Sequence, residues 1–428
     1  MRPWAWVLGG VMALYVLGQS NRALWLPDET RDAGIAWEMS RTGDLVIPRL
    51  NGQPFLEKPP LSYAVAALSL RLWPGRPETA VRVPSALFCL GTLLCTLWIG
   101  RRLCDAGTGL LAACILGTSK TFLELGHTCL VDAGLVFWST LAVAAGLEGD
   151  RRDQRRWWLL SALGVGGAVL SKGPVGILLP GVALGGFLLW ERRGHFLKGL
   201  PWVWMLLVVA LVAGAWLGPL HQAGSLQAYV DEHHRRLGSG VVHAGPVYAY
   251  LLSVFEEFAP WSALLPFFAA WLWMRGGACV QPLRLPLAWF LGCLLVLSVP
   301  ASKRGLYLLP AFPALAVMLA AMLSDAGTAG WGAPWRRALG GILALLAGAP
   351  LAVALYGGRA GFGVAEAAAA LGGLLAVSGA VREARRDQFG PAALTAASGL
   401  VLAWVWMLVV WAPRQDAFRA PGPLIQAA

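Results

Sequence analysis

Residues 24–63 are the longest polar stretch of this sequence, and they hold side chains that could do chemistry. Asp28 and Glu29 follow Pro27, and Lys58 directly precedes a pair of prolines. A carboxylate can accept a proton from a hydroxyl group, and a lysine held in one place can bind a phosphate. We therefore expect this segment, with the charges on its side of the protein, to carry the function.

The rest of the chain has the composition of a membrane protein. Hydrophobic residues make up 57% of its 428 residues and charged residues only 13%, and its mean hydropathy is +0.61. This leaves too little polar surface for a water-soluble protein of that size. The sequence predicts an all-α polytopic membrane protein with about thirteen apolar runs of spanning length. They lie near residues 4–20, 81–100, 106–123, 132–148, 157–171, 174–190, 201–219, 250–273, 285–300, 305–323, 337–356, 362–380 and 391–411.

The distribution of lysine and arginine predicts the orientation of the chain, because short cytoplasmic loops accumulate these residues. If the amino terminus is cytoplasmic, alternate breaks place most of them on one side. These are Arg101, Arg102, Arg151, Arg152, Arg155, Arg156, Arg192, Arg193, Lys198, Arg275, Arg284, Arg336, Arg337, Arg382, Arg385 and Arg386. The net charge of +11 is then mostly an orientation signal. Since these arginines are spread thinly over separate loops, we expect no nucleic-acid partner.

Several cations fall on the opposite, outer side against the orientation rule, which favours a functional role for them. Lys172 lies in a turn so short that its ammonium must stay at the membrane surface, where it could meet a lipid phosphate. Its alternative role is to reach the interface and cap a helical hairpin. The other outer cations are Lys58, Lys303 and Arg304, with Arg22, Arg31, Arg41, Arg49, Arg235 and Arg236 nearby.

Two of these groups are placed by local sequence. The prolines at 59–60 restrict the backbone after Lys58 and precede an amphipathic run, which we expect along the membrane interface. Lys303 and Arg304 stand at the outer start of an apolar helix, with Tyr307 on its first turn. Two cations, a phenol and a positive helix terminus favour an anion site. Ordinary interfacial anchoring is the alternative.

Carboxylates on the same outer side form a matching set. Asp28 and Glu29 are predicted on the first turn of a helix that begins after Pro27, the favoured end for negative charge. Asp28 could serve only as the N-cap of that helix. Asp132 lies at the outer end of an apolar helix, where an ionised group needs a partner. We predict Asp28 and Asp132 as catalytic candidates and Glu29 as a substrate contact.

The second long outer segment, residues 221–250, holds four of the six histidines. A divalent metal could bind there, although the spacing matches no closed zinc pattern. The residues concerned are His233, His234 and His243, with Glu57 or Glu232. Substrate binding, or no binding, is the alternative for these histidines, and His243 and Arg236 are candidate substrate contacts. The sequence predicts no cofactor apart from this candidate metal.

The chain is predicted to form one transmembrane domain over residues 1–412, since neither a soluble domain nor an internal repeat is visible. Its outer parts are a first loop with interfacial helices, residues 21–80, and a second large loop, residues 220–249. Residues 413–428 are expected to form a short outer tail. Residues 1–20 lack the small-residue cleavage site of a signal peptide, so we expect the first helix to be retained.

Several motifs, in order along the chain, resemble those of bacterial membrane glycosyltransferases related to 4-amino-4-deoxy-L-arabinose lipid A transferase, within the wider glycosyltransferase family 39 and protein O-mannosyltransferase group. The longest is PDETRDAGIAWEMSRTGDLVIPRLNGQPFLEKPPLSY, which resembles the first periplasmic loop of that family. The others are LVDAGLVFW, LSKGPVGILLP, DEHHRRL with HAGPVYAY, EEFAPWSALLP and SKRGLYLLPAFP. They cover most of residues 20–320.

The resemblance implies the C-type glycosyltransferase fold in the bacterial inner membrane, with interfacial helices facing the periplasm. It implies a polyprenyl-phosphate-linked sugar as donor. By motif position it implies that Asp28 is catalytic and that Lys58 binds the donor phosphate. Lys172 and the group of Lys303, Arg304 and Tyr307 are implied as further phosphate contacts.

The same resemblance implies a metal position at Glu57 and His233. The doubled histidine in DEHHRRL leaves His233 and His234 as alternatives. The sequence also lacks a substantial carboxy-terminal periplasmic domain, which leaves the sugar and the acceptor open among lipid A, another glycan and protein.

Together these observations suggest transfer with inversion. The donor would enter sideways from the bilayer, and the cations would stabilise the negative charge that grows on the departing phosphate. Asp28 would accept the proton of the acceptor hydroxyl, with Asp132 as orienting carboxylate or second candidate. One base suffices because the phosphate needs no acid to leave, unlike the two-carboxylate arrangement of hydrolases.

Two other classes of protein remain as alternatives. A transporter or lipid flippase would place ionisable groups near the middle of its helices, along a path, whereas here they gather at one face. A non-catalytic membrane assembly subunit would tolerate neutralisation of Lys58, Lys172 and Asp28.

Overall fold

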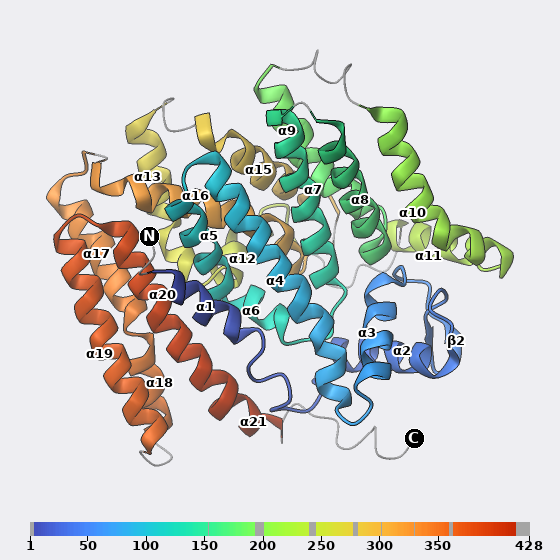
Figure 1. The fold of residues 1–428 in the computed structure, drawn as a ribbon, viewed down its shortest axis with the longest axis horizontal. Coiled ribbons are helices and arrows are strands. Elements are labelled where there is room, and N and C mark those ends of the chain that lie inside the picture. The colour runs from blue at the N-terminus through green and yellow to red at the C-terminus, as the bar shows by residue number, and fades with distance from the viewer. Residues whose placement is uncertain are drawn as a thin grey trace.

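The computed structural model describes residues 4–152, 154–192, 201–238, 245–276, 281–300, 302–328, 330–358 and 363–416. Within these ranges the regular elements are helices and one two-stranded hairpin, which confirms the predicted all-α class (Figure 1). The helices of the first half are α1 (Ala5–Leu14), α2 (Asp28–Thr42), α3 (Leu61–Leu72), α4 (Pro77–Leu103), α5 (Ala106–Thr118), α6 (Lys120–Gly126), α7 (Asp132–Arg152), α8 (Arg155–Lys172), α9 (Val175–Trp190), α10 (Trp202–Gln222) and α11 (Leu226–Gly238).

The second half continues with helices of similar character. They are α12 (Ala249–Glu257), α13 (Leu265–Arg275), α15 (Arg284–Ser298), α16 (Phe312–Asp325), α17 (Ala333–Ala347), α18 (Ala349–Gly358), α19 (Val364–Arg385), α20 (Phe389–Trp406) and α21 (Ala412–Arg414). Short 3₁₀ turns lie at Trp261–Leu264, Gln281–Leu283, Gly305–Ala311 and Ala326–Thr328, and a π-helical turn lies at Met407–Trp411.

Seven helices in the described part of the chain are long and apolar enough to cross a membrane, or eight if one bent pair counts as a span. They are Pro77–Leu103, Trp202–Gln222, Gln281–Ser298, Gly305–Asp325, Ala333–Gly357, Val364–Arg385 and Phe389–Arg414. The chain is thus a multi-pass membrane protein, while the count of thirteen stays a prediction. The expected span at 106–123 differs in shape, because α5 and α6 meet at an angle of 74°.

Helix α2 owes its ends to its sequence. Asp28 and Glu29 occupy its first turn, where the helix dipole favours negative charge. Gly43 ends it with a φ of 82°, a conformation that glycine adopts without strain.

Strands β1 (Arg49–Leu50) and β2 (Gln53–Pro54) pair antiparallel across the Asn51–Gly52 turn. Asparagine and glycine favour the positive φ values that such a two-residue turn requires.

The hairpin of α8 and α9 depends on a glycine at a close approach. A Cβ atom on Gly176 would lie 2.3 Å from the backbone of Ala168, so only glycine lets α9 pack this tightly on α8. Gly134 has a similar role near the start of α7, since a Cβ there would meet the hydroxyls of Ser62 and Ser171 at 2.8 Å. These contacts fix the end of α8 beside the start of α7.

The arginine-rich loops share one end of the helix bundle. Arg151 donates to the carbonyl oxygen of Arg102, which joins the ends of α7 and α4. Arg284 pairs with Glu191 and Arg336 with Asp387. In Figure 1, α2 and α3 lie beside the first turns of α4, whereas Arg101 and Arg102 lie in its last turn. The polar segment and these arginines therefore occupy opposite ends of α4, as the distribution of charge predicts.

Candidate active site

Ion pairs join side chains from five separate parts of the chain at the end of the bundle that carries α2. We call this group the charge cluster. It consists of Asp28, Arg31, Asp32, Lys58, Asp132, Lys172, Arg304 and Tyr307. Its members come from the first turns of α2 and α7, the last turn of α8, the loop before α3 and the start of the 3₁₀ turn that leads into α16.

Asp28 lies between two arginines. Its Oδ2 accepts a hydrogen bond from Nη2 of Arg304 at 2.6 Å, and its Oδ1 is 3.0 Å from Nη2 of Arg31. Burial raises the pKa of Asp28, but the hydrogen bond and charge of Arg304, with Arg31 and Lys58, outweigh burial and hold that pKa below its ordinary value. The N-cap alternative is wrong, because Pro27 is the N-cap and Asp28 is the first helical residue.

Asp32, one turn further along α2, is fully buried. Its Oδ1 accepts from Nε of Arg31 at 3.1 Å and from the Tyr63 hydroxyl at 3.3 Å. Its Oδ2 lies 3.6 Å from Nζ of Lys58 and accepts no hydrogen bond among the described residues. Burial raises the pKa of Asp32, and the charges of Lys58 and Arg31 oppose this shift only in part.

Lys172 and Asp132 form the second part of the cluster. Nζ of Lys172 donates to Oδ1 of Asp132 and lies 4.3 Å from the centre of the Tyr307 ring, over its face. Asp132 begins α7 and Lys172 ends α8, so each charge sits at the helix end that favours its sign. The structure thus gives Asp132 the partner that its position demands.

The two parts are close enough to act on each other electrostatically. Burial lowers the pKa of Lys58, the charge of Asp32 opposes that shift, and the charges of Asp132 and Lys172 contribute further. Burial lowers the pKa of Arg304 as well, but its hydrogen bond to Asp28 outweighs burial and the net shift is upward. The charge of Asp132 adds to this upward shift. Because the two parts influence the same titrations, the cluster is one electrostatic unit.

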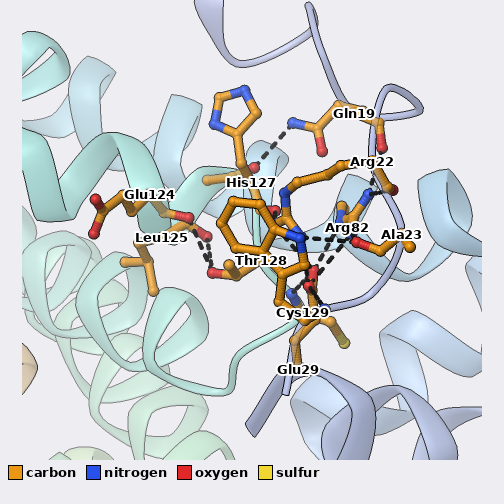
Figure 2. Close-up of polar contacts among 12 residues, drawn as sticks. Gln19, Arg22, Ala23, Glu29, Arg82, Glu124, Leu125, His127, Thr128 and Cys129 are labelled. Atoms are coloured by element: carbon orange, nitrogen blue, oxygen red, sulfur yellow. Dashed lines mark hydrogen bonds and ion pairs between the residues drawn. The ribbon is translucent and has the colours of Figure 1, made fainter. Parts of the chain in front are cut away.

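Glu29 belongs to a different group. Its carboxylate accepts from Arg22 and from Arg82, each at 2.7 Å, and Figure 2 shows the three side chains together. The Trp25 amide donates to it as well, at 2.8 Å. With both oxygens taken and 3% of its surface exposed, Glu29 is not brought into the charge cluster. Its place favours a structural role over the substrate contact that we predicted.

Arg82 fixes the chain that leads into α2. This fully buried guanidinium donates to the carbonyl oxygens of Gln19, Arg22 and Ala23 at 2.8–2.9 Å, besides its bonds to Glu29. Figure 2 shows these groups around one arginine. Since Asp28 directly precedes Glu29, this network also positions Asp28.

Lys303 points away from the charge cluster. Its ammonium donates to the carbonyl oxygens of Leu297, Ser298 and Pro300, which end α15. It also lies 5.6 Å from the centre of the Tyr250 ring. The anchoring alternative fits Lys303, whereas Arg304 and Tyr307 join the cluster.

The candidate residues of the second outer loop fall largely outside the described structure. The backbone of His233 and Arg236 lies in α11, but their side chains are outside the described residues, and so is all of His243. Glu57 is half-buried beside Lys58. Among the described side chains, no three of His, Cys, Asp and Glu are grouped to hold a metal ion. The metal position at Glu57 and His233 therefore stays a prediction.

One small cavity adjoins the charge cluster, and Asp32 is the only cluster residue in its lining. A cavity lined by Asp32, Ser62 and Tyr63, among others, has a volume of about 10 Å³, which is room for roughly one water molecule. A phosphate group is too large for this cavity. An anion that binds the cluster cations competes with their carboxylate partners, and the pair of Asp28 and Arg304, about one fifth and one third exposed, is accessible to it.

Our sequence reasoning missed Asp32 and Arg82 and named Arg31 only as a nearby charge. Asp32 stands one helical turn after Asp28, so the helix predicted there places both carboxylates on one face. That spacing could have identified Asp32. Arg82 gave a weaker signal, a single arginine near the start of a predicted apolar span.

Comparison with known proteins supports the resemblance found in the motifs. The family model described as "Dolichyl-phosphate-mannose-protein mannosyltransferase" matches residues 57–217. An undecaprenyl phosphate-alpha-4-amino-4-deoxy-L-arabinose arabinosyl transferase of Pseudomonas paraeruginosa is 30% identical over 74% of this chain and 59% of its own length. An uncharacterized protein of Aquifex aeolicus is 29% identical over 76% of this chain and 64% of its own. The chain thus spans about three fifths of the length of these relatives.

Solved structures identify the fold. ArnT from Cupriavidus metallidurans bound to undecaprenyl phosphate matches with a TM-score of 0.77 at 23% identity, over 96% of this chain and 78% of that one. Its apo state matches with a TM-score of 0.75. The predicted C-type glycosyltransferase fold is confirmed.

Proposed function

Because the chain is similar over about three quarters of its length to undecaprenyl-phosphate-dependent arabinosyl transferases and shares the fold of ArnT, we propose that it is a membrane glycosyltransferase. It moves a sugar from a polyprenyl-phosphate donor to an acceptor hydroxyl on lipid A, another glycan or a protein. One observation carries this proposal: three cations far apart in sequence meet a set of three carboxylates. Lys58 pairs with Asp32, Lys172 with Asp132 and Arg304 with Asp28.

The cations of the charge cluster suit a lipid phosphate. Arginine can bind a phosphate through two parallel N–H groups, and lysine binds it as a point charge. In a site that excludes bulk water, these groups stabilise the negative charge that develops on the phosphate oxygen as the sugar leaves. Tyr307 stacks against Lys172 and keeps that ammonium facing the cluster.

The reaction balances with one carboxylate. The acceptor oxygen forms a bond to the anomeric carbon, and the bond from that carbon to the phosphate oxygen breaks with its electron pair going to the phosphate. Asp28 takes the proton of the acceptor hydroxyl, and attack from the face opposite the phosphate inverts the anomeric carbon. Asp132 orients Lys172 through their ion pair and is the second candidate for the base.

Donor binding activates Asp28 in this scheme. While Arg304 pairs with Asp28, the low pKa of the carboxyl makes it a weak base. A phosphate that draws Arg304 away removes a hydrogen bond from Asp28 and raises its basicity. The base thus becomes competent once the donor is bound.

The proposed location is the bacterial inner membrane, with the charge cluster on the periplasmic side. The gathering of arginines at the opposite end of the bundle supports this orientation. A metal at Glu57 and His233 would supply Lewis-acid stabilisation of the phosphate, and no step above depends on it.

The test is mass spectrometry of envelope lipids and glycans from cells that lack the gene and cells complemented with it. We expect one glycosyl increment to disappear and return. Complementation with Lys172→Gln should fail, whereas Lys120→Gln should succeed, because Lys120 pairs with the exposed Glu256 outside the cluster. Identical profiles with and without the gene would reject the proposal and favour the assembly-subunit alternative.

A further inference from the structure

Asp32 is a buried carboxylate of the charge cluster for which the proposed reaction has no role. From its position we infer that Asp32 sets the net charge of the site, so that the site holds a singly charged polyprenyl phosphodiester and releases the doubly charged polyprenyl phosphate. This inference rests on the proposed function. It makes Asp32 a positioning residue that controls product release, and not a catalytic residue.

The charges of the cluster can be counted from its ion pairs. Among the described side chains it holds four cations, Arg31, Lys58, Lys172 and Arg304, and three carboxylates, Asp28, Asp32 and Asp132, which leaves one net positive charge. Glu29 does not enter the count, because Arg22 and Arg82 neutralise it separately. Lys303 does not enter it either, because its ammonium points at the carbonyl oxygens that end α15.

Asp32 contributes a negative charge to this count. The charged and titratable groups that act on it come from several elements. They are Arg31 on α2, Lys58 before α3, Tyr63 on α3, Cys129 in the segment before α7, and Asp132 at the start of α7. Arg31 and Tyr63 donate to Oδ1, and the group nearest Oδ2 is the Lys58 ammonium. Since one oxygen accepts two hydrogen bonds and the other faces an ammonium, these contacts suit the ionised carboxylate.

Asp32 is also placed to act only through its neighbours. It has no exposed surface, so a sugar or a phosphate cannot touch it. Its distance of 3.6 Å to Nζ of Lys58 is too long for a hydrogen bond. Lys58 therefore feels the charge of Asp32 without being bound in one orientation and can turn toward a phosphate.

The charge of the lipid phosphate changes during the reaction. The donor is a phosphodiester with one negative charge, which matches the single positive charge of the site. When the bond to the sugar breaks, the product is a phosphomonoester with a charge of about −1.5 to −2 near neutral pH, since its second pKa is about 6. Once Asp28 has released the proton that it took from the acceptor, the site again has one net positive charge. It is then left with excess negative charge, and the product is pushed out.

Removal of Asp32 would reverse this preference. In Asp32→Asn the site has two net positive charges and matches the product in place of the donor. We expect geranylgeranyl phosphate to bind about tenfold more tightly to this variant, while its methyl diester changes much less. In transfer assays kcat and KM should fall together, because product release becomes slow. A merely structural defect would weaken both ligands and raise KM.

The experiment measures binding of both lipids to the purified full-length protein by calorimetry. Asp32→Glu keeps the charge and should restore the ratio of the two affinities. Glu38→Gln is the matched control, because this carboxylate lies on the same helix but bonds only the backbone of Asn51 and Gly52 in its described contacts. An unchanged or smaller preference for the monoester in Asp32→Asn overturns the inference.

A second measurement needs no variant. Lowering the pH of the unmodified protein from about 7.5 to about 5.5 protonates the monoester, whose second pKa is about 6. Its affinity should then rise toward that of the diester, which serves as the control for titration of the protein. A falling monoester affinity relative to the diester overturns the inference. If neither lipid binds to the unmodified protein, the proposed function is rejected. If both lipids bind but the monoester loses affinity relative to the diester, only the inference about Asp32 is rejected.

Discussion

Arg304 donates a hydrogen bond of 2.6 Å to Asp28 across 276 positions of sequence. This contact joins the start of α2 to the 3₁₀ turn before α16, and it pairs the candidate base with a candidate phosphate ligand. Because a lipid phosphate competes with Asp28 for Arg304, the same contact couples donor binding to activation of the base.

Asp28→Asn tests the base directly. We expect kcat to fall by about a hundredfold or more, since general-base catalysis contributes about 10²–10⁴. Donor binding should persist or tighten, because Arg304 is freed for the phosphate. Transfer of a labelled sugar and donor affinity are measured side by side, with Glu38→Gln as the control on the same helix. Near-normal turnover in Asp28→Asn would reject the assignment and leave Asp132 as the candidate.

Arg304→Gln tests the coupling through pH. Arg304 helps to hold the pKa of Asp28 below its ordinary value, so Asp28 stays ionised as the pH falls until that low pKa is reached. Without Arg304 the pKa rises, and the acid limb of kcat/KM, which reports the enzyme before the donor binds, should move to higher pH. The profile is measured at donor concentrations well below KM, and Arg336→Gln, whose partner is Asp387 at the other end of the bundle, should leave the limb in place. An acid limb at the same pH in Arg304→Gln would show that another group controls it.

Whether the sequence could predict a residue of the charge cluster depended on how clearly that residue differs from the residues around it. Asp28, Lys58, Lys172, Arg304 and Tyr307 were predictable because charges beside prolines, helix ends and short turns stand out in an apolar chain. Their convergence depends on contacts between remote segments, which periodicity and composition do not encode.

Two predicted residues, Glu29 and Lys303, lie outside the charge cluster because of what surrounds them. Glu29 and Lys303 have the same residue types as true members of the charge cluster, and only the neighbours reveal that Arg22 and Arg82 saturate one and carbonyl oxygens bind the other. The predicted count of thirteen membrane spans is not confirmed, because some predicted spans are shorter as helices than their apolar runs. Short apolar runs such as 4–20 contain turns that end the helix early, with α1 ending at Leu14.

Arg82→Met tests the network that positions Asp28. Removal of this buried guanidinium takes one of the two arginine partners from Glu29, leaving Arg22, and frees three carbonyl oxygens. We expect a loss of about 3–5 kcal/mol in unfolding free energy, seen as a lower Tm in detergent. The double variant Arg82→Met with Glu29→Gln should not recover that loss, because the buried Arg22 then lacks its partner Glu29. Equal Tm values for Arg82→Met and the unmodified protein would contradict the network.

Gly176→Ala tests the placement of Lys172. The new Cβ would overlap the backbone of α8, so α8 and α9 must separate and Lys172 must shift from Asp132. We expect a loss of about 1–3 kcal/mol and reduced donor affinity. Gly181→Ala is the matched control on the same helix, because its Cβ meets nothing within 4 Å. Equal behaviour of the two variants would mean that the close approach does not hold Lys172 in place.

The central claim is that the charge cluster holds the donor phosphate, and a structure of this protein with bound undecaprenyl phosphate tests it most directly. We predict the phosphate oxygens within about 3 Å of Arg304 and of Lys172 or Lys58, with the bond between Arg304 and Asp28 broken. A phosphate bound away from these cations, for example beside the arginines at the other end of α4, would contradict the account.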